Sequence, residues 1–339
     1  MAQARVIRKL CELGPQQIAD FFALLHERTH AKTREGKPYF ACKFRDAKRT
    51  ATCMVWGDSD LFAECERDWL PGAFYKLRAT YDEHRQYGPT LFVHKLRPVV
   101  EQDRAEGFVE ADLLDRSRFD SEVMFAELVK LATDEIADEP LRQLVTTLLE
   151  VHAERLKLLP GSPKHYYAFP GGWLEHVLSV TRTCLLLVDR YREIHKELSP
   201  PLNRDLVIAG SILHEIGRVA ELQPTTQMGE TPEKTVPGQL FGHIVLGRDM
   251  IREVARGIEK LDAQLLMLLE HIVQTYLALP EWGSPRLPAI PEVLILHHAD
   301  DLDAKLEMYA RCLRRDMGAG PFTDRDPVLG RQLLRDRKA

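Results

Sequence analysis

The segment LVIAGSILHEIGR, residues 206–218, places an imidazole and a carboxylate side by side in an apolar stretch. Its apolar content, bounded by proline-rich segments, predicts a helix over about residues 203–222. His214 and Glu215 would lie inside that helix, where polar side chains are costly to bury unless a partner satisfies them. The partner has to come from another part of the chain or from a bound group.

Four further polar residues share this context, each inside or beside an apolar helical stretch. They are His176 in WLEHV, His243 in FGHI, His271 in LEHIV and Asp300 in HHADDLD. One such histidine alone is more often a hydrogen-bonded core residue than a ligand. Several in one helical region are better explained by a divalent cation between facing helices, because imidazole and carboxylate groups are common metal ligands.

The chain around these residues is predicted to be helical from residue 121 to residue 316. Ser121 suits an N-cap, and Pro140 suits the first turn of a second helix. Later helices are predicted near residues 173–195, 203–222, 239–258, 262–279 and 291–315. Residues 317–339 are expected to form a polar, charged tail.

The first hundred residues follow a different pattern, with a period of two. Phe40, Cys42 and Phe44 fall on one face of a segment and Lys43 and Arg45 on the other, which is typical of a half-buried strand. Further strands are predicted at residues 50–56, 74–81 and 90–99, with a short helix around 61–65 and a partly helical segment at 16–30. We interpret residues 1–100 as a compact barrel and the charged residues 101–120 as a linker.

Composition excludes several classes of protein. The 339 residues are 45% apolar and 29% charged, and no apolar run reaches the ~20 residues of a membrane span. The amino-terminal residues do not resemble an export signal and the six cysteines form no CxxC pair, so we expect a cytoplasmic protein with reduced thiols. Residues 1–100 carry 17 Lys and Arg against 12 Asp and Glu, a balance that suits phosphate binding and a merely solvated surface equally well.

Several further motifs carry a resemblance. They are GKPY (36–39), GGWLEH (171–176), DLVIAG (205–210), GQLFGHI (238–244), EWGSP (281–285) and DLDAK (301–305). With the polar residues above, residues 168–313 resemble HD-domain metal-dependent phosphohydrolases, and most of residues 5–315 resemble the YhaM-type 3′→5′ exoribonucleases. The resemblance implies a multidomain protein, with a small all-β OB-fold barrel followed by an all-α HD-domain helical bundle.

The resemblance also implies a chemistry. It implies a hydrolase that acts on single-stranded RNA or DNA from the 3′ end and releases nucleoside 5′-monophosphates. The cofactor would be a divalent cation, Mn²⁺ first, with Mg²⁺, Co²⁺ or Fe²⁺ as alternatives. The implied metal ligands are His176, His214, Glu215, His243 and Asp300, with His271 as an alternative. His214, Glu215 and Arg218 would be catalytic, and Arg218 stands where the family commonly places a lysine near the phosphate.

Two positions depart from the family pattern. The doublet reads His214-Glu215 instead of His-Asp, and Tyr276-Leu277 stands where the family has a His-His pair that serves a second metal. An alternative function is therefore a catalytically impaired HD-domain protein that acts as a single-stranded nucleic-acid-binding adaptor. A third reading, hydrolysis of a small nucleotide, leaves the OB-fold without a task. The oligomeric state stays open.

The barrel holds the candidates for strand binding, because OB-folds bind single strands by stacking bases on aromatic side chains beside a positive groove. These candidates are Lys43, Arg45, Lys48, Arg49, Trp56 and Tyr87. We rank the charged positions first, since a single aromatic residue in a small barrel is more often part of the core. The stretch His165-Tyr166-Tyr167 precedes His176, and the resemblance implies a place near the mouth of the site, where it either stacks a terminal base or packs its loop on the helices.

Overall fold

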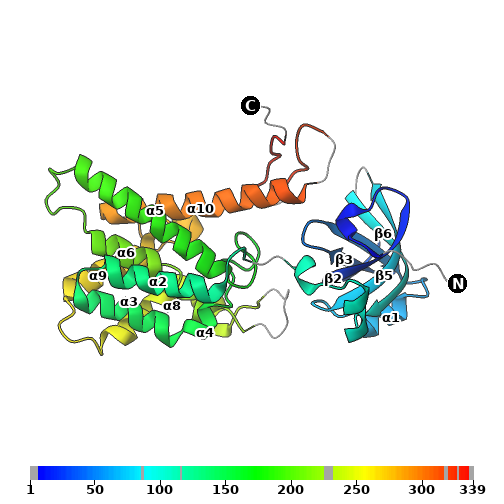
Figure 1. The fold of residues 1–339 in the computed structure, drawn as a ribbon, viewed down its shortest axis with the longest axis horizontal. Helices are drawn as coiled ribbons and strands as arrows, with labels where there is room; N and C mark the ends of the chain where they lie inside the picture. Colours follow the sequence, from blue (N-terminus) through cyan, green and yellow to red (C-terminus); the bar gives the residue numbers. More distant parts are fainter. Residues whose placement is uncertain are drawn as a thin grey trace. The chain divides into compact units, whose positions relative to one another are not determined.

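The computed structural model describes residues 7–84, 88–114, 117–224, 232–316, 320–326 and 328–335. The chain divides into two compact units. Among the described residues, the first unit takes residues 7–114 and the segment from residue 311, and the second takes residues 117–224 and 232–310. Each unit has its own buried apolar core, one formed by strands and the other by helices (Figure 1).

The first unit is a closed barrel. Its strands are β1 (Ile7–Arg8), β2 (Gln17–Lys32), β3 (Pro38–Arg45), β4 (Thr50–Trp56), β5 (Phe74–His84) and β6 (Gly88–Pro98). The 3-10 helix η1 (Leu10–Glu12) precedes β2, and helix α1 (Phe62–Asp68) joins β4 to β5. Strand β2 pairs with β3 and β5, β3 pairs with β4, and β6 pairs with β5 and, in the parallel sense, with β4. Strands β2 to β6 close the barrel, and β1 is added in the parallel sense beside β2. The order of the five closing strands is that of an OB-fold, so the predicted fold class is confirmed.

Strand β2 corrects the prediction of a partly helical segment over residues 16–30. Phe21 and Leu25 point into the barrel core, whereas Phe22 and Leu24 belong to a second cluster with Phe108. Both faces of the strand are therefore covered, and its sequence reads as a continuous apolar run. Such a run cannot be distinguished from a helix by its periodicity.

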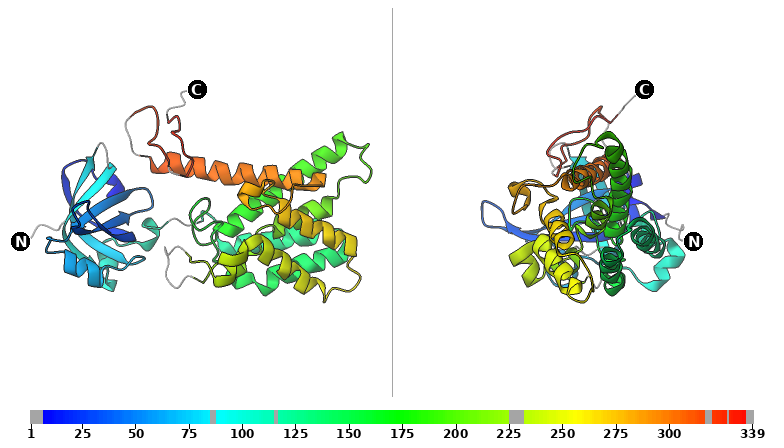
Figure 2. Two further views of the ribbon diagram at one scale, coloured as in Figure 1. Left: turned by 180° about the vertical axis from the view of Figure 1, so that it is seen from behind. Right: turned by 90° about the vertical axis from the view of Figure 1, so that its left-hand side faces the viewer.

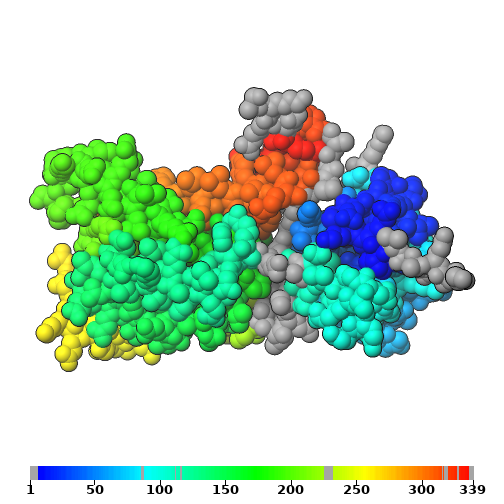
Figure 3. Space-filling view, viewed as in Figure 1, coloured from blue at the N-terminus to red at the C-terminus, as the bar shows by residue number. Residues whose placement is uncertain are grey.

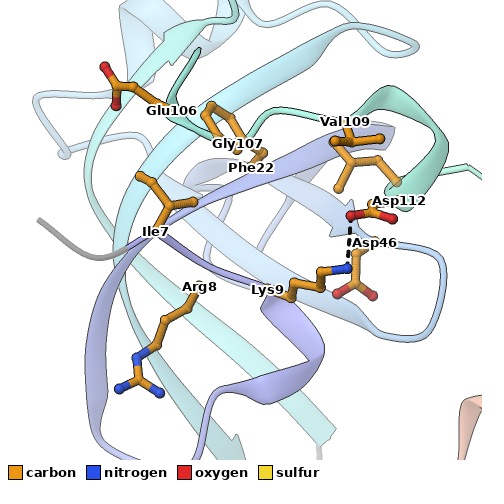
Figure 4. A pocket seen from close by; sticks show the side chains of 10 residues that line it. Ile7, Arg8, Lys9, Phe22, Asp46, Glu106, Gly107, Val109 and Asp112 are labelled. Atoms are coloured by element: carbon orange, nitrogen blue, oxygen red, sulfur yellow. Dashed lines mark ion pairs between the residues drawn. The ribbon is translucent and has the colours of Figure 1, made fainter. Parts of the chain in front are cut away.

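Residues 101–114, predicted as part of the 101–120 linker, are folded onto the barrel. They form the 3-10 helices η2 (Glu101–Glu106) and η3 (Glu110–Asp112), and Phe108, Leu113 and Leu114 pack against β2. Because the stretch contains many charged residues, the three apolar residues that pack on the barrel do not stand out in the sequence. Figure 4 shows the small pocket, about 130 Å³, between this segment and β1, where Lys9 Nζ lies 2.8 Å from Asp112 Oδ2.

The second unit is helical, as predicted. Its elements are α2 (Ser121–Glu135), α3 (Glu139–Val151), α4 (Ala153–Leu156), α5 (Gly172–Ile194), α6 (Arg204–Leu213), α7 (Arg218–Glu221), α8 (Val236–Ala255), α9 (Ala263–Thr275), η4 (Pro280–Trp282) and α10 (Pro291–Arg315). The views from behind and from the side show the long helices α5 and α10 lying on the bundle (Figure 2). Residues of α2 and α3 form much of its surface on the face drawn in Figure 3.

The helix predicted over residues 203–222 is broken after Leu213. Helix α6 ends there and α7 begins at Arg218, so that His214 and Glu215 lie in the turn between the two helices. Gly217 in this turn packs against α8 so closely that a Cβ atom would lie 1.9 Å from the carbonyl oxygen of His243. The close packing of this turn on α8 therefore depends on a glycine, and the helix end presents both polar residues.

None of the described helices combines the length and apolar character that a membrane span requires. All six cysteines are free thiols.

Candidate metal centre

Three parts of the helical unit bring the predicted ligands together. His176 lies near the start of α5, His214 and Glu215 follow the end of α6, and Asp300 lies on α10. Helix α5 begins after Gly171, whose φ of 78° favours glycine. His176, His214 and Glu215 are fully buried, with 0% of each exposed.

The two imidazole rings are held in the same way. His176 Nδ1 lies 2.8 Å from Asp303 Oδ2, and His214 Nδ1 lies 2.8 Å from the carbonyl oxygen of Ser211. Each Nδ1–H therefore donates within the protein, and each Nε2 turns toward Asp300. Asp300 Oδ1 lies 3.0 Å from Nε2 of His176 and 3.4 Å from Nε2 of His214.

The donor set fits a divalent cation. His176, His214 and Glu215 each offer one ligand atom, and these atoms all lie within 4.8 Å of one another. Among the described residues, His214 Nε2 and Glu215 Oε2 are buried without a hydrogen-bond partner. Buried atoms of this kind are costly, and a cation bound by two imidazoles and carboxylate oxygens would satisfy both of them.

The other oxygen of Glu215 is already occupied. Glu215 Oε1 accepts a hydrogen bond from the Tyr166 hydroxyl at 2.7 Å and one from Arg218 Nη2 at 2.9 Å. The ring of Tyr166 also packs against that of His176, with centroids 5.0 Å apart. These contacts hold Glu215 with its unpartnered Oε2 available to a cation.

The electrostatics of the cluster favour a charged ion pair when no cation is bound. Burial alone would lower the pKa of His176, but hydrogen bonds with Asp300 and Asp303 outweigh it and raise this pKa to about 10. Burial opposes ionisation of Asp300, yet the hydrogen bond with His176 and the nearby ring of His214, with Nε2 at 3.4 Å, hold its pKa below the ordinary value. A cation that binds His176 must therefore displace a proton.

Arg218 was predicted to grip the substrate phosphate, and the structure gives its donors to two buried carboxylates. Nη1 donates to Glu221 Oε2 at 2.7 Å, and Nη2 donates to Glu215 at 2.9 Å. Glu221 Oε1 also pairs with Lys234 Nζ at 2.9 Å. In this arrangement Arg218 neutralises and orients Glu215 through Nη2, while its Nε is buried without a hydrogen-bond partner in the described part of the chain.

The remaining predicted histidines lie outside the cluster. His243 Nε2 is hydrogen-bonded to the Tyr276 hydroxyl at 2.9 Å, and its Nδ1 lies 3.5 Å from Glu221 Oε2. His271 Nε2 accepts a hydrogen bond from the backbone N–H of Ala289 at 3.0 Å, which ties α9 to the loop before α10. Tyr276 packs edge-on against His214, so its side chain contacts His214 with its ring and His243 with its hydroxyl.

Sequence reasoning missed several residues that build this site. Asp303 and Glu307 follow Asp300 on the same face of α10, and Glu307 Oε2 accepts a hydrogen bond from the backbone N–H of Tyr167 at 3.1 Å. The spacing of three and seven residues on a helix could have revealed them. Glu221, which follows Arg218 by three residues, could have been found in the same way.

The strand-binding candidates on the barrel differ in their exposure. Arg49 is only 8% exposed and donates from Nη1 to the carbonyl oxygens of Leu10 and Leu13, so little of its side chain is accessible to a strand. Lys43 lies on the outer face of β3, where its Nζ pairs with Glu27 Oε2 at 2.8 Å. Arg45 is half-buried and Lys48 is exposed.

Trp56, one of the two aromatic candidates, is more accessible than expected. Trp56 is 45% exposed and lies opposite Tyr39 on β3, with ring centroids 5.3 Å apart. The two rings form an aromatic pair on the outside of the barrel instead of in its core. Tyr87 lies outside the described residues.

Comparison of the sequence with known proteins finds one domain family and a group of relatives. The family model described as HD domain matches residues 173–305. Proteins named 3′-5′ exoribonuclease YhaM match the chain along most of its length. That of Bacillus subtilis (strain 168) is 29% identical over 321 residues, 93% of each chain, and that of Oceanobacillus iheyensis is 29% identical over 306 residues, 90% of each chain.

A solved structure, described as the crystal structure of fission yeast Pot1 and ssDNA, is similar at a TM-score of 0.24 and 10% identity, covering 28% of this chain and 40% of the other. A likeness this low adds nothing to the strand order, which defines the barrel.

Proposed function

From the premise that this chain contains an HD domain and is a relative of the exoribonucleases named YhaM, we propose that it is a metal-dependent 3′→5′ exoribonuclease. The observation that carries the proposal is the convergence of His176, His214 and Glu215, with two buried donor atoms left unpartnered. The substrate would be single-stranded RNA and the product a nucleoside 5′-monophosphate. We further propose the cytoplasm as the compartment, which agrees with six free thiols.

The metal would be held by Nε2 of His176 and His214, by Glu215 Oε2 and by Asp300. We propose Mn²⁺, because mixed nitrogen and oxygen ligands suit such a cation. When bound, it would polarise a phosphoryl oxygen and favour ionisation of water. Asp303 and Ser211 fix the two imidazole rings, while Tyr166 and Arg218 fix the carboxylate, so the ligand geometry is prepared by the protein.

The reaction consumes one water for each nucleotide released. A new bond forms between the water oxygen and the phosphorus of the last phosphodiester. The bond from that phosphorus to the 3′ oxygen of the preceding nucleotide breaks, and this oxygen takes up a proton to become the new 3′ end. Water must attack the phosphorus from the side opposite the leaving oxygen, so the phosphate has to be held with the two oxygens in line. A rigid, buried set of ligands would hold it in that position.

The barrel would hold the rest of the strand. The Tyr39–Trp56 pair offers aromatic faces on β3 and β4, and Lys43 lies on the same outer face of β3. OB-folds commonly bind oligonucleotides on this part of the barrel, by stacking and by phosphate contacts. The acidic partner of Lys43, Glu27, would have to be exchanged for a phosphate.

The first test separates enzyme from adaptor. We expect wild-type protein with Mn²⁺ to shorten a 5′-labelled single-stranded RNA progressively and to release labelled mononucleotide at once from a 3′-labelled one. His176→Ala and His214→Ala should each lose bound Mn²⁺ and reduce the rate by more than about 100-fold. Removal of a ligand affects metal binding more than removal of a residue that only hydrogen-bonds to a ligand. EDTA should stop the wild-type reaction.

The matched control is His298→Ala, since His298 lies on α10 but is exposed and outside the cluster. It should retain metal and activity. Wild-type protein that holds no metal, degrades nothing and still binds RNA would contradict the proposal and favour the adaptor, whose clearest support is Tyr276 in place of a second-metal histidine.

The second test concerns the barrel. Trp56→Ala should weaken binding of a long single-stranded RNA by about 10-fold, because stacking of one base contributes about 1–3 kcal/mol. It should leave Mn²⁺ binding unchanged. Phe92→Ala is the control, since Phe92 is also exposed but lies on β6 outside the aromatic pair. Equal RNA affinity of both variants and wild type would exclude Trp56 from the binding face.

A further inference from the structure

His176 is contacted on both edges of its ring by carboxylates from α10. Nε2 faces Asp300 Oδ1 at 3.0 Å, and Nδ1 faces Asp303 Oδ2 at 2.8 Å. The two nitrogens point away from each other, so Asp303 lies on the side of the ring opposite the converging donors. It cannot share through this contact the cation that Nε2 would bind.

An imidazole can bind a cation only through a nitrogen that carries a lone pair. A neutral histidine has two tautomers, and the hydrogen bond at one nitrogen decides which of them is present. A carboxylate at Nδ1 accepts the proton there and leaves the lone pair on Nε2. Carboxylates that orient a metal-binding histidine in this way also raise its basicity.

His214 differs from His176 in the group that accepts the hydrogen bond from Nδ1–H. Its Nδ1 is held by the backbone carbonyl oxygen of Ser211, three residues earlier in the same chain segment. Because the acceptor is a backbone oxygen, no substitution of another side chain removes this contact. The ring of His176 depends instead on a side chain from another helix, so its orientation can be altered by mutation.

Asp303 is itself held in place. Ser179, one turn after His176 on α5, donates its hydroxyl hydrogen to Asp303 Oδ1. One carboxylate oxygen therefore serves α5 through Ser179, and the other serves the imidazole ring. The side chain is only partly accessible at the edge of the buried cluster.

We propose that Asp303 is a positioning residue that selects the Nδ1-protonated form of His176 and so turns Nε2 into a metal ligand. The inference rests on the proposed metal-dependent function. It assigns Asp303 a role distinct from that of Asp300, although the two carboxylates lie one turn apart on α10.

The test measures metal binding and the state of the ring, not activity. Asp303→Ala should raise the Mn²⁺ dissociation constant about 10- to 100-fold, the usual effect of removing a partner of a ligating histidine. Asp303→Asn keeps an oxygen that can accept from Nδ1–H and should recover part of the affinity. Asp301→Ala is the matched control, because Asp301 is the neighbouring carboxylate and pairs with Lys305 at 2.7 Å.

The second readout is the ring itself. In Zn²⁺-loaded protein with ¹⁵N-labelled histidine, wild type should show a protected Nδ1–H signal for His176, and Asp303→Ala should lose it. Melting of the metal-free variants separates this effect from a general loss of stability. Should Asp303→Ala abolish folding, Asp303→Asn carries the same comparison, with a smaller rise in the dissociation constant and a weakened Nδ1–H signal.

Two results would overturn the inference. If wild type binds Mn²⁺ and both Asp303 variants bind it equally well, Asp303 only packs α10 on α5, and the proposed function survives. If wild type binds no Mn²⁺ and no Zn²⁺, the proposed function fails and the role of Asp303 fails with it.

Discussion

Glu215 stands where the HD-domain proteins that the sequence resembles have an aspartate, and its side chain is longer by one methylene. The added length lets the carboxylate contact two other side chains. The carboxylate reaches past the backbone turn to accept hydrogen bonds from Tyr166 and Arg218 on Oε1, while Oε2 stays unpartnered. Burial raises the energy of its charged form, but the positive charge of Arg218 outweighs this and holds the pKa of Glu215 below the ordinary value. Tyr166 and Arg218 therefore hold the longer side chain in place, and the ionised form of Glu215 is favoured.

Glu215→Asp tests this reading at the scale of one side chain. Shortening the carboxylate by one C–C bond, roughly 1.5 Å, would make it give up either Tyr166 and Arg218 or the cation. We expect Mn²⁺ affinity to fall about 10-fold, measured by direct titration, with a matching loss of nuclease rate.

Glu270→Asp is a suitable control, because Glu270 is a buried glutamate that pairs with Arg248 and Arg252 away from the cluster. It should bind Mn²⁺ as wild type does. Tighter binding by Glu215→Asp would contradict the prediction and show that the site still suits the shorter residue.

Residue types alone do not reveal which charged side chains pair with groups inside the protein. Arg49 and Arg218 were both predicted to meet phosphate, and both are turned inward, one to backbone carbonyls and the other to two glutamates. An arginine in the sequence carries the same charge in either case. Only the position of its partner in space decides whether a ligand can use it.

At the scale of elements, η2 is tied to the barrel by one buried carboxylate. Asp103 is 1% exposed and accepts two hydrogen bonds from Arg97 on β6, at 2.7 and 2.6 Å, and one from the backbone N–H of Val100. The hydrogen bonds from Arg97 lower the pKa of Asp103 to about 2. The charged form is therefore favoured by the fold.

This contact predicts a dependence of barrel stability on pH. A carboxyl group whose pKa is lower in the folded state adds stability above its unfolded pKa, here 3.8, and loses it as pH falls through the folded value of about 2. Asp103→Asn should cost about 2 kcal/mol at pH 7. The difference from wild type should shrink toward pH 2 in urea unfolding followed by Trp69 fluorescence.

Asp68→Asn provides the comparison, because Asp68 forms an exposed ion pair with Arg67. Its stability should follow that of wild type at every pH. An unchanged stability of Asp103→Asn at pH 7 would show that η2 is held by its apolar contacts alone.

At the scale of the whole molecule, the chain joins two cores of different kinds. Trp69 is fully buried in the barrel core and Trp173 in the helical core, where its Nε1–H donates to the backbone oxygen of Glu215 at 3.1 Å. The candidate metal centre belongs to the helical unit alone. A cation that binds the folded state stabilises the unit that contains the site.

We therefore expect Mn²⁺ to raise the unfolding temperature reported by Trp173 and to leave that reported by Trp69 unchanged. At 100 times the dissociation constant the added stability would be about 2.7 kcal/mol. Variants with single tryptophans would separate the two signals. His214→Ala should abolish the shift, whereas an equal shift at both tryptophans would mean that the two cores unfold together.

The sequence by itself determined much of this architecture. Periods of two and of 3.6 residues marked most strands and helices, because burial of one face is written into neighbouring positions. The polar residues in apolar helices pointed to His176, His214, Glu215 and Asp300, and equally to His243 and His271, because such groups need a partner wherever they fold. The family resemblance is confirmed by the relatives that match the chain along most of its length.

Tertiary structure alone decided the rest. Strand β2 is covered on both faces, residues 101–114 fold onto the barrel, and Asp303 meets a histidine 127 residues away in sequence. It also turned Arg218 inward and placed Tyr276 between His214 and His243. A hydrogen bond depends on distance and direction between groups that only the folded chain brings together, and no local pattern encodes that meeting.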